Sequence, residues 1–168
     1  IVKYSREQMV PFLGICLGLQ CAIIEFARNA CKMRGANSTE FNAQTKYPVI
    51  DLMESQRAIK IKGGTMRLGA YDCQIKTGTR TYAAFRKKKI SERHRHRYEV
   101  NNKYKKTLEK NGLIFSGVNQ ALNVVETIEV KNHPWFIASQ FHPELKSRIN
   151  RAHPLFREFI KAAVKNRP

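Results

Sequence analysis

Two apolar stretches joined by a short glycine-flanked junction dominate the first part of the chain. Residues 10–15 form a short apolar run, which is typical of a strand buried on both faces. Over residues 17–30 the apolar positions recur at helical spacing and cover most of the helix surface. Residues 1–9 are predicted to form a helix that ends before Pro11. Cys16 is therefore expected where a strand turns into a helix.

The rest of the chain alternates between strand-like and helix-like patterns. A short basic helix is predicted over residues 103–110, with Gly112 as its C-cap. A last helix begins at His153 and Pro154 and carries an apolar stripe expected to pack in the core. Strands are predicted at residues 47–53, 65–71, 113–118, 124–130 and 135–141.

Two stretches are less informative. Residues 54–62 are predicted to form a basic loop, and the glycine pair at 63–64 a tight turn. A nucleotide-binding loop is the alternative for these glycines, but the Gly-Lys-Ser/Thr of a P-loop is missing. Residues 72–89 show no pattern that selects a structure.

The position of Cys16 indicates a nucleophile. A thiol at a helix N-terminus meets unpaired N–H groups and the positive end of the helix dipole, and both favour the reactive thiolate. Gly14 and Gly18 complete Gly-x-Cys-x-Gly, the cysteine counterpart of the serine elbow. The N–H of Leu17 would face a developing oxyanion. The alternative is that Cys16 is one more small buried hydrophobic residue.

A cysteine nucleophile needs a base, and the predicted strand at 135–141 supplies one. His142 and Glu144 follow this strand directly. Because the carboxyl ends of parallel strands share one edge of a sheet, His142 and Cys16 are expected to meet there. Glu144 would hold the imidazole in one tautomer, as the acid does in other triads.

Several motifs in this order resemble a known family. Gly-Ile-Cys-Leu-Gly-Leu-Gln (14–20) with Gln-Phe-His-Pro-Glu (140–144) resembles the class I glutamine amidotransferases. Three further stretches, at 35–41, 63–69 and 92–101, are similar to the glutaminase domains of CTP synthases. Together the motifs cover nearly the whole chain.

The resemblance implies a fold and an organisation. It implies an α/β fold with three layers, in which helices flank a mostly parallel, flavodoxin-like open sheet. Residues 1–168 would form one glutaminase domain that is partial at its N-terminus, so that the first strands of the sheet and a glycine-rich loop with the second oxyanion donor are absent. The synthetase domain of the family would be absent as well.

The resemblance also implies an activity and its partners. The domain would hydrolyse L-glutamine through a cysteine thioester and supply ammonia for the amination of UTP to CTP. It would need no metal or cofactor, whereas the synthetase domain would use ATP, Mg²⁺ and UTP, with GTP as activator. The full-length protein would be a homotetramer. Another class I glutaminase and an inactive interaction domain of the same fold are the alternatives.

The motifs place the family's site residues on this sequence. The catalytic residues implied are Cys16, His142 and Glu144. The residues implied to bind glutamine are Leu17, Gly18, Leu19, Gln20, Glu40 and Arg97.

For two of these glutamine-binding residues, the surrounding sequence supports an interpretation of its own. Ser38 and Thr39 are good N-cap residues, so Glu40 could instead lie in the first turn of a helix. Arg97 belongs to an alternating Arg-His segment, residues 93–98, which places the arginines on one face of an extended chain and the histidines on the other. A guanidinium fork suits the α-carboxylate of glutamine. The histidines could bind a metal, but a structural role is favoured because no further ligand is evident.

The composition limits the remaining possibilities. The chain carries 31 Lys and Arg against 13 Asp and Glu, a formal charge of +18. This charge raises a nucleic-acid hypothesis, but no stacking aromatics or DNA-binding motif accompany it, so no nucleic acid is expected. The four cysteines lack C-x-x-C spacing, which argues against a zinc or redox site. No apolar stretch reaches membrane length, and a cytoplasmic location is expected.

Overall fold

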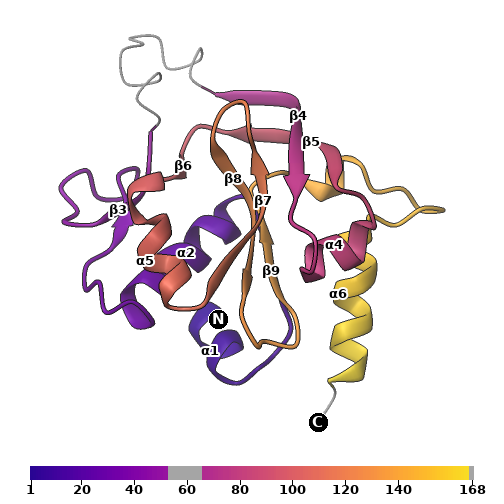
Figure 1. Cartoon of the computed structure of the whole chain (residues 1–168), viewed down its shortest axis with the longest axis horizontal. Coiled ribbons are helices and arrows are strands. Elements are labelled where there is room, and N and C mark those ends of the chain that lie inside the picture. The colour runs from indigo at the N-terminus through magenta and orange to yellow at the C-terminus, as the bar shows by residue number, and fades with distance from the viewer. Residues whose placement is uncertain (53–65, 167–168) are drawn as a thin grey trace.

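A six-stranded sheet forms the centre of the structure (Figure 1). The computed structural model describes residues 1–52 and 66–166. The predicted loop at 54–62, the predicted turn at 63–64, and residues 53 and 65 of two predicted strands lie outside these ranges. In spatial order the strands are β1 (Phe12–Ile15), β9 (Phe136–Ser139), β8 (Val124–Val130), β7 (Leu113–Asn119), β4 (Arg67–Ile75) and β5 (Lys89–His96).

A second, smaller sheet has three strands. Its order is β2 (Asn37–Ser38), β3 (Pro48–Asp51) and β6 (Glu99–Val100). Strand β6 follows β5 closely in sequence, so the segment between them connects the two sheets. That segment contains Arg97.

The strand directions correct one expectation. The sheet was expected to be mostly parallel, but among the described residues only the pairs β1/β9 and β2/β3 are parallel. The pairs β4/β5, β4/β7, β7/β8, β8/β9 and β3/β6 are antiparallel. The reason is local, because β7 and β8 are joined by a four-residue turn and short connections produce antiparallel neighbours. The α/β class with helices flanking a sheet is confirmed.

The helices divide between the two faces of the large sheet. Helices α1 (Val2–Glu7), α2 (Leu17–Asn29) and α5 (Lys105–Lys110) lie on one side, and α4 (Arg80–Phe85) and α6 (Pro154–Lys165) on the other. Strand β9 shows the division, because Phe136 and Ala138 pack in one buried cluster and Ile137 in the other. This arrangement gives three layers.

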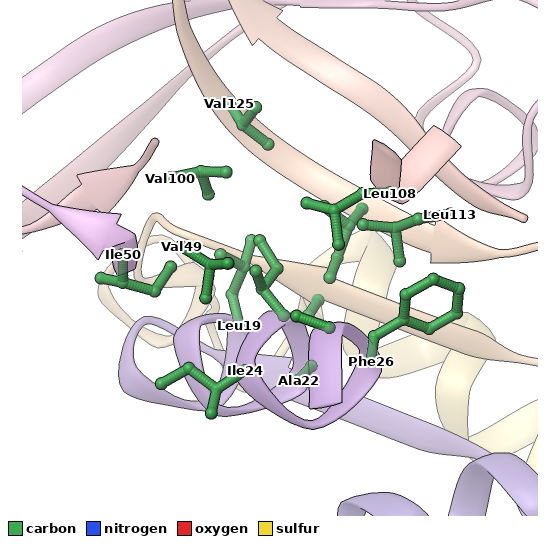
Figure 2. Packing of buried hydrophobic residues seen from close by; sticks show 14 of the residues in the cluster. Leu19, Ala22, Ile24, Phe26, Val49, Ile50, Val100, Leu108, Leu113 and Val125 are labelled. Carbon is green, nitrogen blue, oxygen red and sulfur yellow. The ribbon is translucent and has the colours of Figure 1, made fainter. Parts of the chain in front are cut away.

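The larger cluster is built around α2. Figure 2 shows Leu19, Ala22 and Phe26 of this helix against residues of β3, β6, α5, β7 and β8. Leu19 and Ala22 are essentially unexposed. Burial on this scale stabilises the fold by about 25 cal/mol per Å² of apolar surface, so the start of α2 is firmly anchored beneath Cys16.

Other predicted elements are confirmed in kind, with shifted ends. The predicted helix at 103–110 consists of a 3-10 turn, η2 (Asn102–Tyr104), followed by α5. Helix α6 begins at Pro154 as predicted, and His153 is its N-cap, whose ring accepts the N–H of Leu155. The stripe on α6 is only partly core, however. Ile160 and Val164 are more than half exposed, because the face of the helix that packs on the second cluster carries Leu155, Phe159 and Ala162 instead.

The uninformative segment 72–89 contains regular structure. It holds the second half of β4, the six-residue helix α4 and the first residue of β5. No helix in the described part of the chain has the length and apolar character needed to cross a membrane.

Candidate active site

Cys16 occupies a strained turn between β1 and α2. Its backbone has φ 51° and ψ −101°, a conformation that residues with a Cβ rarely adopt. Gly14 makes the turn possible, because a Cβ there would lie 2.9 Å from both Ala138 Cβ and the carbonyl of Gly18. Gly18 itself has open space where its Cβ would be, so the close approach requires glycine at position 14 only.

The parallel pairing of β1 with β9 brings the two halves of the site together. Ile15 lies opposite Ser139, and the N–H of Cys16 donates to the Ser139 carbonyl at 2.7 Å. Gln140 then lies beside Cys16, with its Nε2 3.7 Å from the sulfur. His142 follows two residues later, so the expected meeting of the two strand ends is confirmed for their backbones.

The environment of the Cys16 thiol contains opposing effects. Burial is the largest and raises its pKa above the ordinary value. The Leu17 N–H and the Gln140 amide, both hydrogen-bonded to the sulfur, act in the opposite direction, while the charges of Glu144 and Glu99 raise the pKa further. The helix N-terminus alone predicts a lowered pKa, so in the free protein burial outweighs it.

His142 and Glu144 are paired as expected. His142 Nδ1 lies 2.6 Å from Glu144 Oε1, across the first turn of the 3-10 helix η3 (Pro143–Leu145). Within the described residues the other ring nitrogen, Nε2, is buried and has no hydrogen-bond partner. The backbone N–H of His142 donates to Arg93 O at 2.8 Å, which ties this segment to β5. The imidazole is thus fixed through Nδ1, whereas Nε2 has no partner among the described residues and is left for proton transfer.

Gln20 connects the nucleophile helix to the segment that carries Arg97. Its Nε2 donates to Tyr98 O at 3.2 Å and to Gln140 Oε1 at 3.4 Å. Arg97 is half-buried and lies directly before Tyr98. This contact places the predicted carboxylate-binding arginine on a backbone that α2 and the end of β9 both hold.

The other predicted glutamine-binding residues differ in their burial and hydrogen bonds. Leu19 is fully buried in the core, and its N–H donates to Cys16 O within α2. Glu40 is exposed on a turn after β2, where its N–H donates to Ser38 Oγ. No helix begins at this turn, so the capping alternative for Ser38 is wrong. Leu17 is about half exposed at the start of α2.

The alternating Arg-His segment behaves as predicted. In β5 the side chains of Arg93 and Arg95 are exposed, and those of His94 and His96 are buried. No group of three or more His, Cys, Asp or Glu in residues 1–52 and 66–166 is placed to hold a metal ion. The two histidines instead contact buried glutamates, in agreement with the structural role favoured for them.

Sequence reasoning missed Gln140 as a functional residue. It belongs to the motif at 140–144 but was assigned no role, although its amide lies between the thiol and Gln20. The usable signal was its position, because it follows the strand that pairs with the nucleophile strand. Tyr98 was missed for a different reason, since it contributes a backbone carbonyl that the sequence does not reveal.

Comparisons with known proteins agree with this geometry. The family model described as glutamine amidotransferase class-I matches residues 1–162. The CTP synthase of Pelodictyon phaeoclathratiforme is 59% identical over 162 residues, and that of Chloroherpeton thalassium is 58% identical over 167 residues. These matches cover 96% and 99% of this chain, but only 29% and 30% of the relatives. The chain therefore spans less than a third of the length of these curated relatives.

Solved structures give the same result for the fold. The glutaminase domain of Trypanosoma brucei CTPS, with bound acivicin, superposes with a TM-score of 0.92 at 34% identity, covering 99% of this chain and 65% of that one. A Thermoplasma acidophilum protein described as a GMP synthase component superposes with a TM-score of 0.60 at 18% identity, covering 98% and 62%. The second likeness concerns the fold alone. Because the family model spans nearly the whole chain, the chain belongs to the class I glutamine amidotransferase family.

Proposed function

We propose that this chain is the glutaminase part of a CTP synthase and that it hydrolyses L-glutamine to glutamate and ammonia. One observation carries the proposal: a cysteine on a strained elbow lies at the end of β1, beside the end of β9, where the His142–Glu144 pair follows. The identity of 57–59% to CTP synthases supports the choice among glutaminases.

In the first half of the reaction Cys16 attacks the side-chain amide carbon of glutamine. The thiol proton passes to Nε2 of His142, and the sulfur–carbon bond forms a tetrahedral oxyanion. The Leu17 N–H, which already points at the sulfur, donates to this oxyanion. The carbon–nitrogen bond then breaks, and His142 returns the proton so that ammonia leaves.

In the second half water replaces the departed amine. His142 takes a proton from the water, whose oxygen attacks the thioester carbon. The carbon–sulfur bond breaks, the thiolate regains the proton from His142, and glutamate is released. Glu144 accepts the Nδ1–H of His142 throughout and keeps Nε2 available for the transfers.

The amino-acid end of glutamine would be held near Arg97 and Glu40. The guanidinium of Arg97 would bind the α-carboxylate, and the carboxylate of Glu40 the α-ammonium. Glu40 is exposed in this structure, so its contact would form when glutamine binds. Gln20, Gly18 and the start of α2 would line the same pocket.

The remaining parts of the proposal concern the longer protein. The ammonia would pass to an ATP- and Mg²⁺-dependent synthetase domain that aminates UTP, with GTP as activator and a homotetramer as the assembly. No metal or cofactor is proposed for the glutaminase part. A cytoplasmic location fits these soluble substrates.

A comparison of nitrogen sources tests the proposal in the full-length protein. Cys16→Ala should abolish CTP formation from glutamine but leave CTP formation from added ammonium chloride within about 3-fold, because only the thioester step needs the thiol. Equal loss with both nitrogen sources would contradict a separate ammonia-producing site. Retention of glutamine-dependent CTP formation would contradict the role of Cys16.

A further inference from the structure

Five buried polar side chains form a closed ring beneath the segment that carries Arg97. Arg67 Nη1 donates to Glu99 Oε1 at 3.0 Å, and Arg67 Nη2 donates to Glu126 Oε1 at 2.6 Å. Glu126 Oε2 lies 3.4 Å from His94 Nε2, and His94 Nδ1 lies 2.9 Å from His96 Nε2. His96 Nδ1 closes the ring 3.4 Å from Glu99 Oε1. None of the five residues is more than 6% exposed.

Few other groups can change the charge of this ring. The Tyr71 ring stacks on the Arg67 guanidinium, with Arg67 Cζ 4.5 Å from the centroid of the tyrosine ring. The same ring makes an edge contact with His94. The Cys73 thiol lies within electrostatic range, and burial raises its pKa, so it stays neutral. His142 also lies close enough to disfavour a positive charge on either histidine.

The hydrogen-bond directions within the ring follow from one carbonyl. His96 Nδ1 faces two acceptors, Tyr98 O at 3.1 Å and Glu99 Oε1 at 3.4 Å, so this nitrogen must carry a hydrogen. Burial and the Arg67 charge lower the pKa of His96 to about 3 and that of His94 to about 2, so both rings are neutral. A neutral imidazole has one N–H, so His96 Nε2 accepts from His94 Nδ1.

The same logic leaves His94 Nε2 as a bare acceptor. It faces Glu126 Oε2, and neither atom has a hydrogen-bond partner among the described residues. Two buried acceptors at 3.4 Å are unfavourable unless a proton lies between them. A proton at this contact satisfies both atoms. It also makes the ring neutral, because Arg67 then balances the charge of Glu99 alone.

We infer that the ring holds one proton on Glu126, donated to His94, and that in this state it positions the Tyr98 carbonyl on which the active site is built. Burial raises the pKa of both carboxyls, which favours a protonated group in the ring. The contacts place the proton on Glu126, because Glu99 Oε1 meets only donors, Arg67 and His96, whereas Glu126 Oε2 faces the bare His94 Nε2.

The ring reaches the nucleophile through a short series of contacts. Tyr98 O accepts from both His96 and Gln20, and Gln20 also donates to Gln140, whose amide lies 3.7 Å from the Cys16 sulfur. Members of the ring are therefore positioning residues, not catalytic ones. This role rests on the proposed glutaminase function, whereas the proton arrangement does not.

Nitrogen-15 NMR of the histidine rings tests the proton arrangement without any turnover. His94 and His96 should both remain neutral Nδ1–H tautomers from pH 8 to pH 5, with single-residue variants used for assignment. An Nε2–H tautomer at His96, or protonation of either ring between pH 7 and pH 5, would overturn the inference. This result is independent of whether the chain hydrolyses glutamine.

Two isosteric variants test the positioning role. Glu126→Gln keeps a donor toward His94 and an acceptor toward Arg67, so the KM for glutamine should stay within about 3-fold of wild type. Glu99→Gln leaves the Arg67 charge unbalanced, and KM should rise about 10-fold or more while kcat falls less. Glu126→Gln as damaging as Glu99→Gln would overturn the assignment of the proton. Glu129→Gln is the matched control, since Glu129 is also buried in β8 but caps α4 instead.

A second pair of variants decides the case if Glu99→Gln does not fold. Asn at position 96 can reproduce the Nδ1–H donor toward Tyr98 O, whereas Gln places its amide further out, near the position of Nε2. His96→Asn should therefore raise the KM for glutamine less than His96→Gln does. The KM values of the two variants should differ by about 5-fold or more. Equal effects of the two substitutions on KM would contradict the positioning role. Loss of wild-type activity itself would instead contradict the proposed function.

Discussion

His142 and Glu144 are joined by a 2.6 Å contact between Nδ1 and Oε1, across a single 3-10 turn. The short spacing in sequence and the proline between them fix the pair in one orientation. The Glu144 side chain is 47% exposed, against 21% for His142. Glu144 therefore orients His142 from the solvent side, and this exposure limits how much its charge can contribute to catalysis.

Glu144→Gln should lower kcat for glutamine hydrolysis by about 100-fold. The expected loss is smaller than the roughly 10⁴-fold known for a buried triad acid, because solvent screens an exposed carboxylate. Steady-state ammonia release measures the change. Glu109→Gln, at an exposed position on α5, is the control and should leave kcat unchanged. A loss in Glu144→Gln of less than about 3-fold would contradict the orienting role.

Gly14→Ala should destabilise the fold, because the new methyl group would lie 2.9 Å from Ala138 Cβ and from backbone atoms of Gly18. Overpacking of this kind costs about 1–3 kcal/mol. Gly18→Ala is the matched control, since its Cβ would meet nothing and alanine favours a helix by up to about 1 kcal/mol. Urea unfolding of both variants checks this difference. Equal stabilities would show that the β1–α2 turn is less tightly packed than the structure indicates.

Gln140→Ala should slow the alkylation of Cys16 by a neutral reagent at pH 8 by about 3-fold. The amide of Gln140 stabilises the thiolate, and its removal raises a pKa that burial has already raised. Alkylation rates measured by mass spectrometry test this. A faster reaction in the variant would mean that Gln140 shields the sulfur and has no effect on its charge.

Stability should be greatest near pH 6.5 because of the buried ring. His94 and His96 stay neutral in the folded state but bind protons below pH 6.5 when unfolded, so their contribution is lost as pH falls. Burial raises the pKa of Glu126 to about 7, so the contribution of its proton is present below pH 4.5 and is lost as pH rises through 7. Because two histidines oppose one carboxyl, the net stability rises up to about pH 6.5 and falls above it.

Urea unfolding across this pH range measures the expected profile. The free energy of unfolding should fall by about 1.4 kcal/mol per pH unit from pH 6.5 to pH 4.5, and by up to about that slope just above pH 6.5. His94→Gln removes one of the two histidines, so it should flatten the profile below pH 6.5 and leave the fall above pH 6.5 unchanged. A profile that rises steadily from pH 5 to pH 8 would contradict the buried carboxyls.

The local features of the site were accessible from the sequence. The strand, the elbow at Cys16 and the helix behind it follow from apolar periodicity and two glycines, and the alternation at residues 93–96 correctly separated exposed arginines from buried histidines. The structural assignment confirms these elements with ends shifted by one or two residues.

Features that depend on pairing between strands were not accessible. The sequence does not show that β4/β5 and β7/β8 pair antiparallel, so the sheet was expected to be mostly parallel. Helix α4 has only six residues, too few to display a period, although Thr79 caps it. The ring around Arg67 combines four strands, and the roles of Gln140 and the Tyr98 carbonyl appear only when β1, β5 and β9 are placed together.

The most direct test of the account is mass spectrometry of the chain after incubation with acivicin, the compound bound in the related Trypanosoma brucei domain. Wild type should gain one adduct on Cys16, with none on the fully buried Cys73. His142→Ala should form the same adduct more slowly, and Cys16→Ala should form none. Equal labelling of all four cysteines, or labelling of Cys16→Ala to the wild-type extent, would contradict an activated thiol in a glutamine site.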